Sequence, residues 1–186
     1  MKTQAIIISV LLGLFSTPVL ADHTTDHTVA DLVARVAALE AKLATVSTVK
    51  VNGQPTVRFT GVNVQIVNGT KQQTASSNGR GNLILGYDLD RNDATYFCSD
   101  GAYTTSGACS GAGGLWAVSH KSGSHYLVIG DFNNYSQYGG VVAGSFNTGN
   151  GAYASVSGGL QNTASGPGTS VSGGGTTTPP AASSPA

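Results

Sequence analysis

Histidine and serine, the side chains that many hydrolases use, lie together around residue 120. His120 and His125 flank the tetrapeptide Lys-Ser-Gly-Ser. A Ser/His/Asp hydrolase needs a serine that is activated by a histidine and held on a rigid scaffold. The chain has no Gly-x-Ser-x-Gly motif, which would present such a serine. Its many serines also place one near any histidine by chance, so we predict no catalytic residue and expect a protein that is not an enzyme.

Carboxylates with a spacing suited to calcium lie shortly before the first cysteine. Asp88-x-Asp90-x-Asn92 matches the start of a calcium-binding loop. The sixth position of that loop is normally Gly and the twelfth is Glu, whereas this chain has Asp93 and Ser99 there. The pattern therefore favours solvated loop carboxylates, and calcium binding stays an open alternative.

A second metal candidate is a pair of histidines near the start of the mature chain. His23 and His27 are four residues apart, so they could share one face of a helix and gather a metal ion between helices. A helix end frays too easily to hold such a site. We therefore predict no metal and no cofactor.

The composition limits the classes of partner. Charged residues make up 10% of the chain, and nine Lys and Arg balance nine Asp and Glu. Nucleic-acid binding requires clustered cations, so nucleic acid is excluded as an expected partner. Glycine supplies 26 of the 186 residues, about twice its usual share, and this excess points to a fold with many tight turns.

The N-terminus predicts export. Residues 1–21 combine Lys2, an apolar stretch from Ala5 to Phe15, and Val19-Leu20-Ala21 as a cleavage site, which is the pattern of a secretory signal peptide. No later apolar run reaches the length of about 18 residues that suggests a membrane-spanning helix. We therefore expect a secreted, extracellular or cell-surface protein with no membrane-spanning segment in the mature chain.

The two cysteines, Cys98 and Cys109, fit this destination. An oxidising compartment favours a disulfide between them, and their spacing is not the Cys-x-x-Cys of redox enzymes. The intervening residues are rich in Ser, Gly and Thr and cannot bury a core of their own. Closing a loop of this size contributes about 2–3 kcal/mol, so the sequence predicts a structural disulfide.

Residues 22–50 have the pattern of a short coiled coil. Apolar residues recur at alternating spacings of three and four along a narrow seam: Val29, Leu32, Val36, Leu39, Leu43 and Val46. A helix of this length is marginal alone in water, so it requires partner helices. Arg35 and Glu40 flank the seam in an Arg-h-x-x-h-Glu pattern associated with trimers, and they can pair between neighbouring helices. We predict a homotrimer; the alternative is an amphipathic helix packed on its own domain.

The C-terminal half contains a repeat of about 14 residues. Its valines are spaced by 14, 14 and 15 residues, asparagines follow them at matching offsets, and Leu83 to Gly86 form an earlier, looser copy; the repeated positions are Val128, Val142, Val156 and Val171 with Asn133, Asn147 and Asn162. Such a unit is too short for a strand and a helix, but it suits one rung of a β-solenoid. Inward valines would stack, and asparagines would form ladders at the corners.

These patterns divide the chain into six segments of a mainly β protein. After the signal peptide and the coiled coil, we predict the first β-strands or rungs over 51–86, a disulfide-stapled insertion loop over 87–125, β-roll repeats over 126–173 and a disordered tail over 174–186. A single narrow roll buries few apolar residues per rung. Three rolls around one axis would share a core, in agreement with the coiled coil.

The segment from Gly151 to Gly166, Gly-Ala-Tyr-Ala-Ser-Val-Ser-Gly-Gly-Leu-Gln-Asn-Thr-Ala-Ser-Gly, resembles the head repeats of YadA-like trimeric autotransporter adhesins. The resemblance extends over about 126–173 and implies a left-handed parallel β-roll, trimerisation and display at a surface. Residues 81–144 are also similar to a group of secreted bacterial proteins in which a short coiled coil precedes such repeats.

The first functional interpretation is thus a secreted homotrimeric, structural or adhesin-like head that mediates surface attachment or display. A second is a glycan- or ligand-binding module that uses the aromatic side chains of the 87–125 insertion as a recognition surface: Tyr96, Tyr103 and Trp116. A third is a β-solenoid enzyme. Known solenoid enzymes have charged clefts, whereas residues 132–186 contain no charged side chain, so this interpretation ranks last.

Overall fold

A computed structural model describes residues 23–72 and 77–175, which form two compact units. The helix–hairpin unit comprises residues 23–64, and the roll unit comprises residues 65–175. The predicted signal peptide and all but the first two residues of the predicted tail lie outside the described residues.

The helix–hairpin unit consists of one helix and one two-stranded sheet. Helix α1 runs from His23 to Leu43, and strands β1 (Val46–Val51) and β2 (Gln54–Phe59) pair in an antiparallel register with Val46 opposite Phe59. The connecting residues Asn52 and Gly53 both have positive φ, at 49° and 80°, as the tightest hairpin turns require. Val46, which the seam pattern assigned to the helix, therefore lies in a strand.

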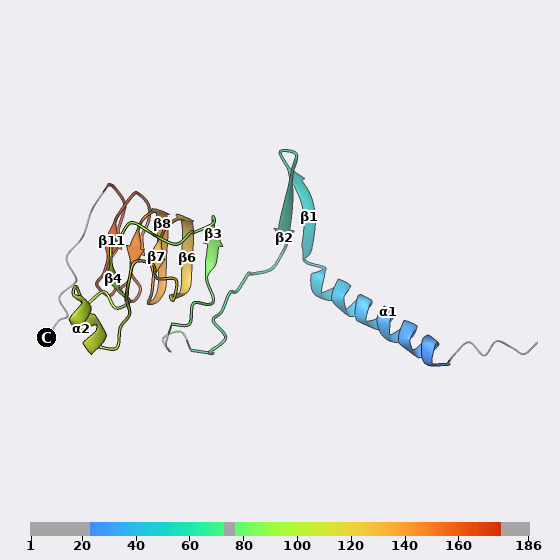
Figure 1. Ribbon diagram of the computed structural model, residues 1–186. Helices are drawn as coiled ribbons and strands as arrows, with labels where there is room; N and C mark the ends of the chain where they lie inside the picture. Colours follow the sequence, from blue (N-terminus) through green and yellow to red (C-terminus); the bar gives the residue numbers. More distant parts are fainter. Residues whose placement is uncertain (1–22, 73–76, 176–186) are drawn as a thin grey trace, which may run out of the picture. The chain divides into compact units, whose positions relative to one another are not determined.

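The roll unit is a parallel β-solenoid of about three turns, with strands stacked side by side in two sheets (Figure 1). The larger sheet has the order β12-β10-β8-β6-β3, and its strands are β3 (Leu83–Leu85), β6 (Ser124–Asp131), β8 (Tyr138–Ser145), β10 (Ser155–Val156) and β12 (Ser170–Val171). The smaller sheet has the order β11-β9-β7, with strands β7 (Asn134–Tyr135), β9 (Thr148–Gly149) and β11 (Thr163–Ala164). The predicted mainly β, parallel solenoid is confirmed.

The valine repeat forms the interior of the roll. Val128 pairs with Val142, Val142 with Val156, and Val156 with Val171, in parallel register. The first three are fully buried, and Tyr126 closes the interior beside Val128 and Val142. Each rung therefore contributes one inward valine to a continuous column, as the repeat predicted.

The asparagine repeat forms a hydrogen-bonded ladder along one corner. The backbone N–H of Asn147 donates to Oδ1 of Asn133 at 3.1 Å, and the N–H of Asn162 donates to Oδ1 of Asn147 at 2.7 Å. The side-chain amide of Asn147 in turn donates to the carbonyl oxygen of Gly159 at 2.9 Å. These groups are buried, and the ladder supplies the partners that buried polar groups require.

The insertion between β3 and β6 is a small antiparallel structure closed by the predicted disulfide. Strand β4 (Phe97–Cys98) pairs with β5 (Trp116–Ala117), and helix α2 (Ser106–Gly111) lies between them in the sequence. Thr105 caps this helix through its side-chain oxygen. Cys98 and Cys109 form a disulfide and are fully buried, so the staple fixes α2 against β4.

Candidate functional site

The first candidate site is the apolar seam of α1. Val29, Leu32, Val36, Leu39 and Leu43 are each more than half exposed in the single chain. Globular proteins bury side chains of this kind because each contributes about 1.5–3 kcal/mol on leaving water. The seam is therefore a regular apolar stripe, and no other described residue of the helix–hairpin unit covers it.

The hairpin that follows is equally uncovered. Val57 and Phe59 are 60% and 54% exposed, and among residues 28–64 no residue is buried. An isolated two-stranded hairpin is at best marginally stable in water. The helix–hairpin unit has apolar side chains at core-like spacing but no core.

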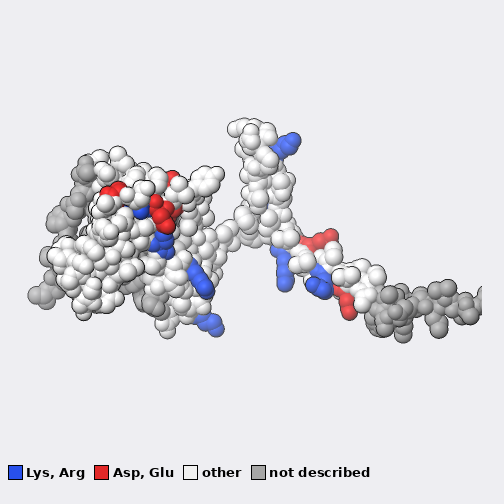
Figure 2. Space-filling view, in the orientation of Figure 1, with Lys and Arg blue, Asp and Glu red and all other residues white. Residues whose placement is uncertain are grey.

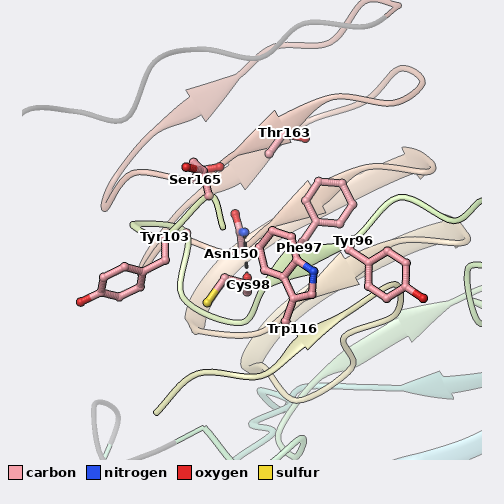
Figure 3. A pocket seen from close by; sticks show the side chains of 10 residues that line it. Tyr96, Phe97, Cys98, Tyr103, Trp116, Asn150, Thr163 and Ser165 are labelled. Carbon is pink, nitrogen blue, oxygen red and sulfur yellow. Dashed lines mark hydrogen bonds between the residues drawn. The ribbon is translucent and has the colours of Figure 1, made fainter. Parts of the chain in front are cut away.

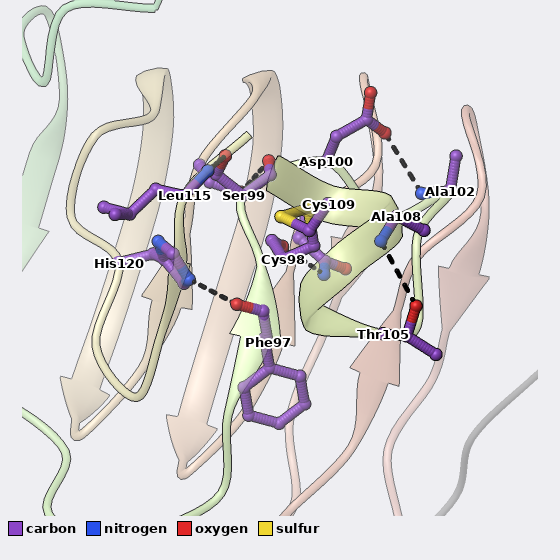
Figure 4. The surroundings of a disulfide bond; sticks show 12 residues. Phe97, Cys98, Ser99, Asp100, Ala102, Thr105, Ala108, Cys109, Leu115 and His120 are labelled. Carbon is purple, nitrogen blue, oxygen red and sulfur yellow. Dashed lines mark hydrogen bonds between the residues drawn. A yellow bond between two sulfur atoms is a disulfide. The ribbon is translucent and has the colours of Figure 1, made fainter. Parts of the chain in front are cut away.

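The second candidate site is built where the insertion lies across the turns of the roll (Figure 4). The backbone N–H of Gly101 donates to the carbonyl of Asn150 at 2.9 Å, and the side-chain amide of Asn150 donates to the carbonyl of Cys98 at 3.1 Å. The carbonyl oxygen of Ser99 accepts hydrogen bonds from the side chains of Ser136 and Gln137, which belong to the preceding turn of the roll. A Cβ atom at Gly101 would lie 2.2 Å from the carbonyl oxygen of Ser165, so the insertion and the roll are in direct backbone contact.

Arg91 ties the start of the insertion to the roll. Its guanidinium donates to the carbonyls of Phe132 and Asn147 at 3.1 and 3.2 Å, and it lies over the rings of Phe97 and Phe146. The residue is only 5% exposed. Burial lowers the pKa of Arg91, and the nearby carboxylate of Asp93 raises it in part. Figure 2 shows charged side chains gathered in one part of the visible face of the roll unit, most of which is uncharged.

Asp88, the first residue of the calcium-like pattern, continues the asparagine ladder. Its Oδ1 accepts the backbone N–H of Asn133 at 3.0 Å and the ammonium of Lys121 at 2.8 Å. Burial raises the pKa of Tyr135, and the neighbouring Asp88 carboxylate raises it further. Asp90 instead accepts a hydrogen bond from Ser119. These carboxylates therefore have separate protein partners.

The two histidines considered for catalysis each have a hydrogen-bond partner of their own. His120 is buried, and its Nε2 lies 2.9 Å from the carbonyl oxygen of Phe97. His125 accepts the backbone N–H of Asn68 at its Nε2. Within the described ranges, no group of three or more His, Cys, Asp or Glu could hold a metal ion. The side chains of His23 and His27 lie outside the described residues.

The aromatic residues of the insertion line a pocket of about 220 Å³ against the roll (Figure 3). Tyr96, Tyr103 and Trp116, which the sequence singled out, come together there with Phe97. The roll contributes Asn150 and Ser165 to the opposite side. Asn150 is 4% exposed, its Nδ2 binds the carbonyl of Cys98, and its Oδ1 has no hydrogen-bond partner.

Sequence reasoning missed three residues of these sites. Asp88 was considered only as the start of a calcium-like pattern, and neither Arg91 nor Asn150 was considered. No sequence signal pointed to Arg91, because the carbonyl groups that it binds lie 41 and 56 residues further along the chain. Asn150 carries no such signal, because it follows the repeated Asn147 as one of many polar residues.

The helices of the described residues include none that is long and apolar enough to cross a membrane. The chain matches no protein-family model, no curated protein and no solved structure. The geometry above is therefore the basis for a functional assignment.

Proposed function

We propose that the protein is a secreted homotrimer whose coiled coil displays three short β-rolls at an extracellular or cell surface, where they act as a structural or adhesin-like head. The observation that carries this proposal is the lack of a buried residue among residues 28–64. Three copies of α1 joined along the seam would bury the five exposed apolar side chains, and a coiled coil needs a seam of this kind.

The outer face of the roll supports the same association. Leu83, Leu85 and Ile129 project from the larger sheet and are 46%, 51% and 37% exposed. Along the strands they alternate with the buried Val128 and with its register partner Ile84, which is itself 45% exposed. Trimeric coiled coils would hold the three rolls at high effective concentration, so such faces can associate even when one contact is weak.

Display at a surface follows from the predicted signal peptide, the disulfide and the uncharged C-terminal repeat. A structural disulfide persists in oxidising compartments. The resemblance of the rungs to trimeric adhesin heads agrees with this role. Attachment would arise from many weak contacts multiplied by three, without chemistry at any residue.

The test is attachment of the mature chain, residues 22–186, to surfaces in a flow-cell measurement. The matched variant is Leu39→Asp, which places a charge in the seam and leaves the roll unchanged. We expect the parent chain to leave the surface roughly 100-fold more slowly than the variant, because trivalency reduces the dissociation rate. Equal dissociation rates for the two chains would contradict the proposal.

A further inference from the structure

We propose that the pocket formed by Tyr96, Phe97, Tyr103, Trp116, Asn150 and Ser165 binds one ring of a neutral sugar. The pocket lies wholly within the roll unit, so one copy is complete in each chain. The inference goes beyond trimeric display, because it assigns a ligand class to a specific cavity.

The buried side-chain oxygen of Asn150 accepts no hydrogen bond from the described residues. Figure 3 places Asn150 in the middle of the lining residues, with its amide hydrogen-bonded to Cys98 and its oxygen turned away from that bond. A buried carbonyl oxygen without a partner is costly. The Oδ1 is already buried without a partner in the chain alone, so a ligand that brings a hydroxyl or N–H group within reach adds a hydrogen bond that a purely apolar ligand cannot offer.

The rest of the lining selects the class of that ligand. Aromatic rings offer apolar faces to aliphatic C–H groups, and the hydroxyl groups of Thr163 and Ser165 can exchange hydrogen bonds with further ligand hydroxyls. None of the described residues that line the pocket is charged, so an anionic ligand finds no cation there. A neutral pyranose combines an aliphatic face with several hydroxyl donors and meets both requirements.

The size and support of the pocket limit the ligand to a single ring. Its volume of about 220 Å³ is below the roughly 300 Å³ at which pockets for drug-sized ligands begin. The disulfide fixes Cys98, and the carbonyl of Cys98 holds the amide of Asn150. The acceptor is therefore pre-positioned, which reduces the entropy lost on binding.

The chain contains one tryptophan, and it lines the pocket, so emission excited where tryptophan absorbs and tyrosine does not reports on this site. The mature chain is titrated with methyl glycosides of glucose, galactose, mannose, fucose and N-acetylglucosamine. We expect a saturable change in emission with at least one of them, at a Kd of roughly 1 mM. No saturable change with any of the five, or a change with glucuronic or sialic acid alone, would overturn the assignment.

Two comparisons locate the binding. Tyr96→Ala removes an exposed ring of the pocket and should raise the Kd roughly tenfold, whereas Tyr87→Ala, at a 92% exposed ring of the same insertion, should leave it unchanged. Among monodeoxy forms of the best glycoside, one should lose binding roughly tenfold, because it lacks the hydroxyl that donates to Asn150. Equal affinities in either comparison would contradict the site.

This test is separate from that of the trimer. The Leu39→Asp chain should bind the free glycoside with the parent Kd, because the pocket contains no residue of the helix–hairpin unit. A monomeric parent chain that still binds the sugar would refute the trimer and leave the pocket standing. A trimeric parent chain that binds none of the five glycosides would refute the sugar site and leave the trimer standing.

Discussion

The helix–hairpin unit and the roll unit differ in whether a single chain buries their apolar side chains. The roll buries its valine column and asparagine ladder within one chain. The helix–hairpin unit exposes the five seam residues of α1, although they recur at regular spacings of three and four. Regular apolar spacing thus marks a surface suited to contact. Whether that surface is covered within one chain depends on how the chain folds around it.

The two units also differ in the interactions that stabilise them. In the proposed trimer, the seam of α1 would depend on apolar contact, which tolerates changes of shape. The roll depends on closely stacked backbones, which the side-chain amide of Asn147 links and which Gly144 permits because it has no side chain. Substitutions should therefore be more damaging in the roll than in the helix, and should affect different observables.

The largest effect is expected for Gly144→Ala in the roll. Gly144 has a φ of +98°, and a Cβ atom there would lie 2.2 Å from the carbonyl oxygen of Gly159. The clash and the backbone strain together should lower the free energy of unfolding of the roll by about 3–5 kcal/mol in urea titrations. Gly158→Ala is the matched control, because no atom lies within 4 Å of its added Cβ. Similar losses for both variants would contradict the stacking argument.

The next effect is expected for Leu39→Asp in the seam. A charge buried between three helices should cost about 3 kcal/mol per site and reduce the mass in solution to that of one chain. Ala41→Asp, on the face of α1 away from the seam, should keep the oligomer. In a single chain both positions are exposed, so equal behaviour of the two variants would show that the seam has no partner.

A smaller effect is expected when the disulfide is removed by Cys98→Ser with Cys109→Ser. Loss of the staple should destabilise the insertion by about 2–3 kcal/mol and speed hydrogen exchange over β4 and α2. Exchange at Val128 and Val142 should not change, because these residues are buried within the roll. Unfolding of the whole roll in this variant would mean that the insertion is part of its core.

The smallest effect is expected for Arg35→Ala beside the seam. In the proposed trimer, pairing between Arg35 and Glu40 of neighbouring helices would be exposed to solvent, so its loss should cost less than about 1 kcal/mol per chain and lower the melting temperature of the oligomer slightly. Lys50→Ala, in β1, should have no effect on that temperature. A complete loss of the oligomer in Arg35→Ala would show that charge pairing, rather than the apolar seam, holds it.

The sequence was sufficient for the roll because its repeats are local and periodic. The valine column and the asparagine ladder follow from fixed offsets within about 14 residues. The second hairpin strand, β2, lies within the predicted first strands over 51–86. The first, β1, was missed because the seam spacing continues into Val46, where β-branched residues and the Asn52-Gly53 turn favour a strand over another helical turn. Two local signals competed there, and the turn determined the structure.

The pocket was only half predictable. Its aromatic residues form a cluster in the sequence, but their partner Asn150 lies more than thirty residues away in the roll. The position of Asp88 at the end of the asparagine ladder was hidden in the same way, because the insertion separates it from Asn133. Contacts between the insertion and the roll depend on how the insertion folds back over the roll. The spacing of residues in the sequence does not predict this.

The most direct test of the account is the mass in solution of residues 22–186, measured by light scattering on a sizing column under oxidising conditions. The exposed seam of α1 predicts three times the mass of one chain, and the Leu39→Asp chain should elute as a single copy with an intact roll. A parent chain that elutes as a monomer, at concentrations where short coiled coils associate, would contradict the claim that α1 joins copies of this protein.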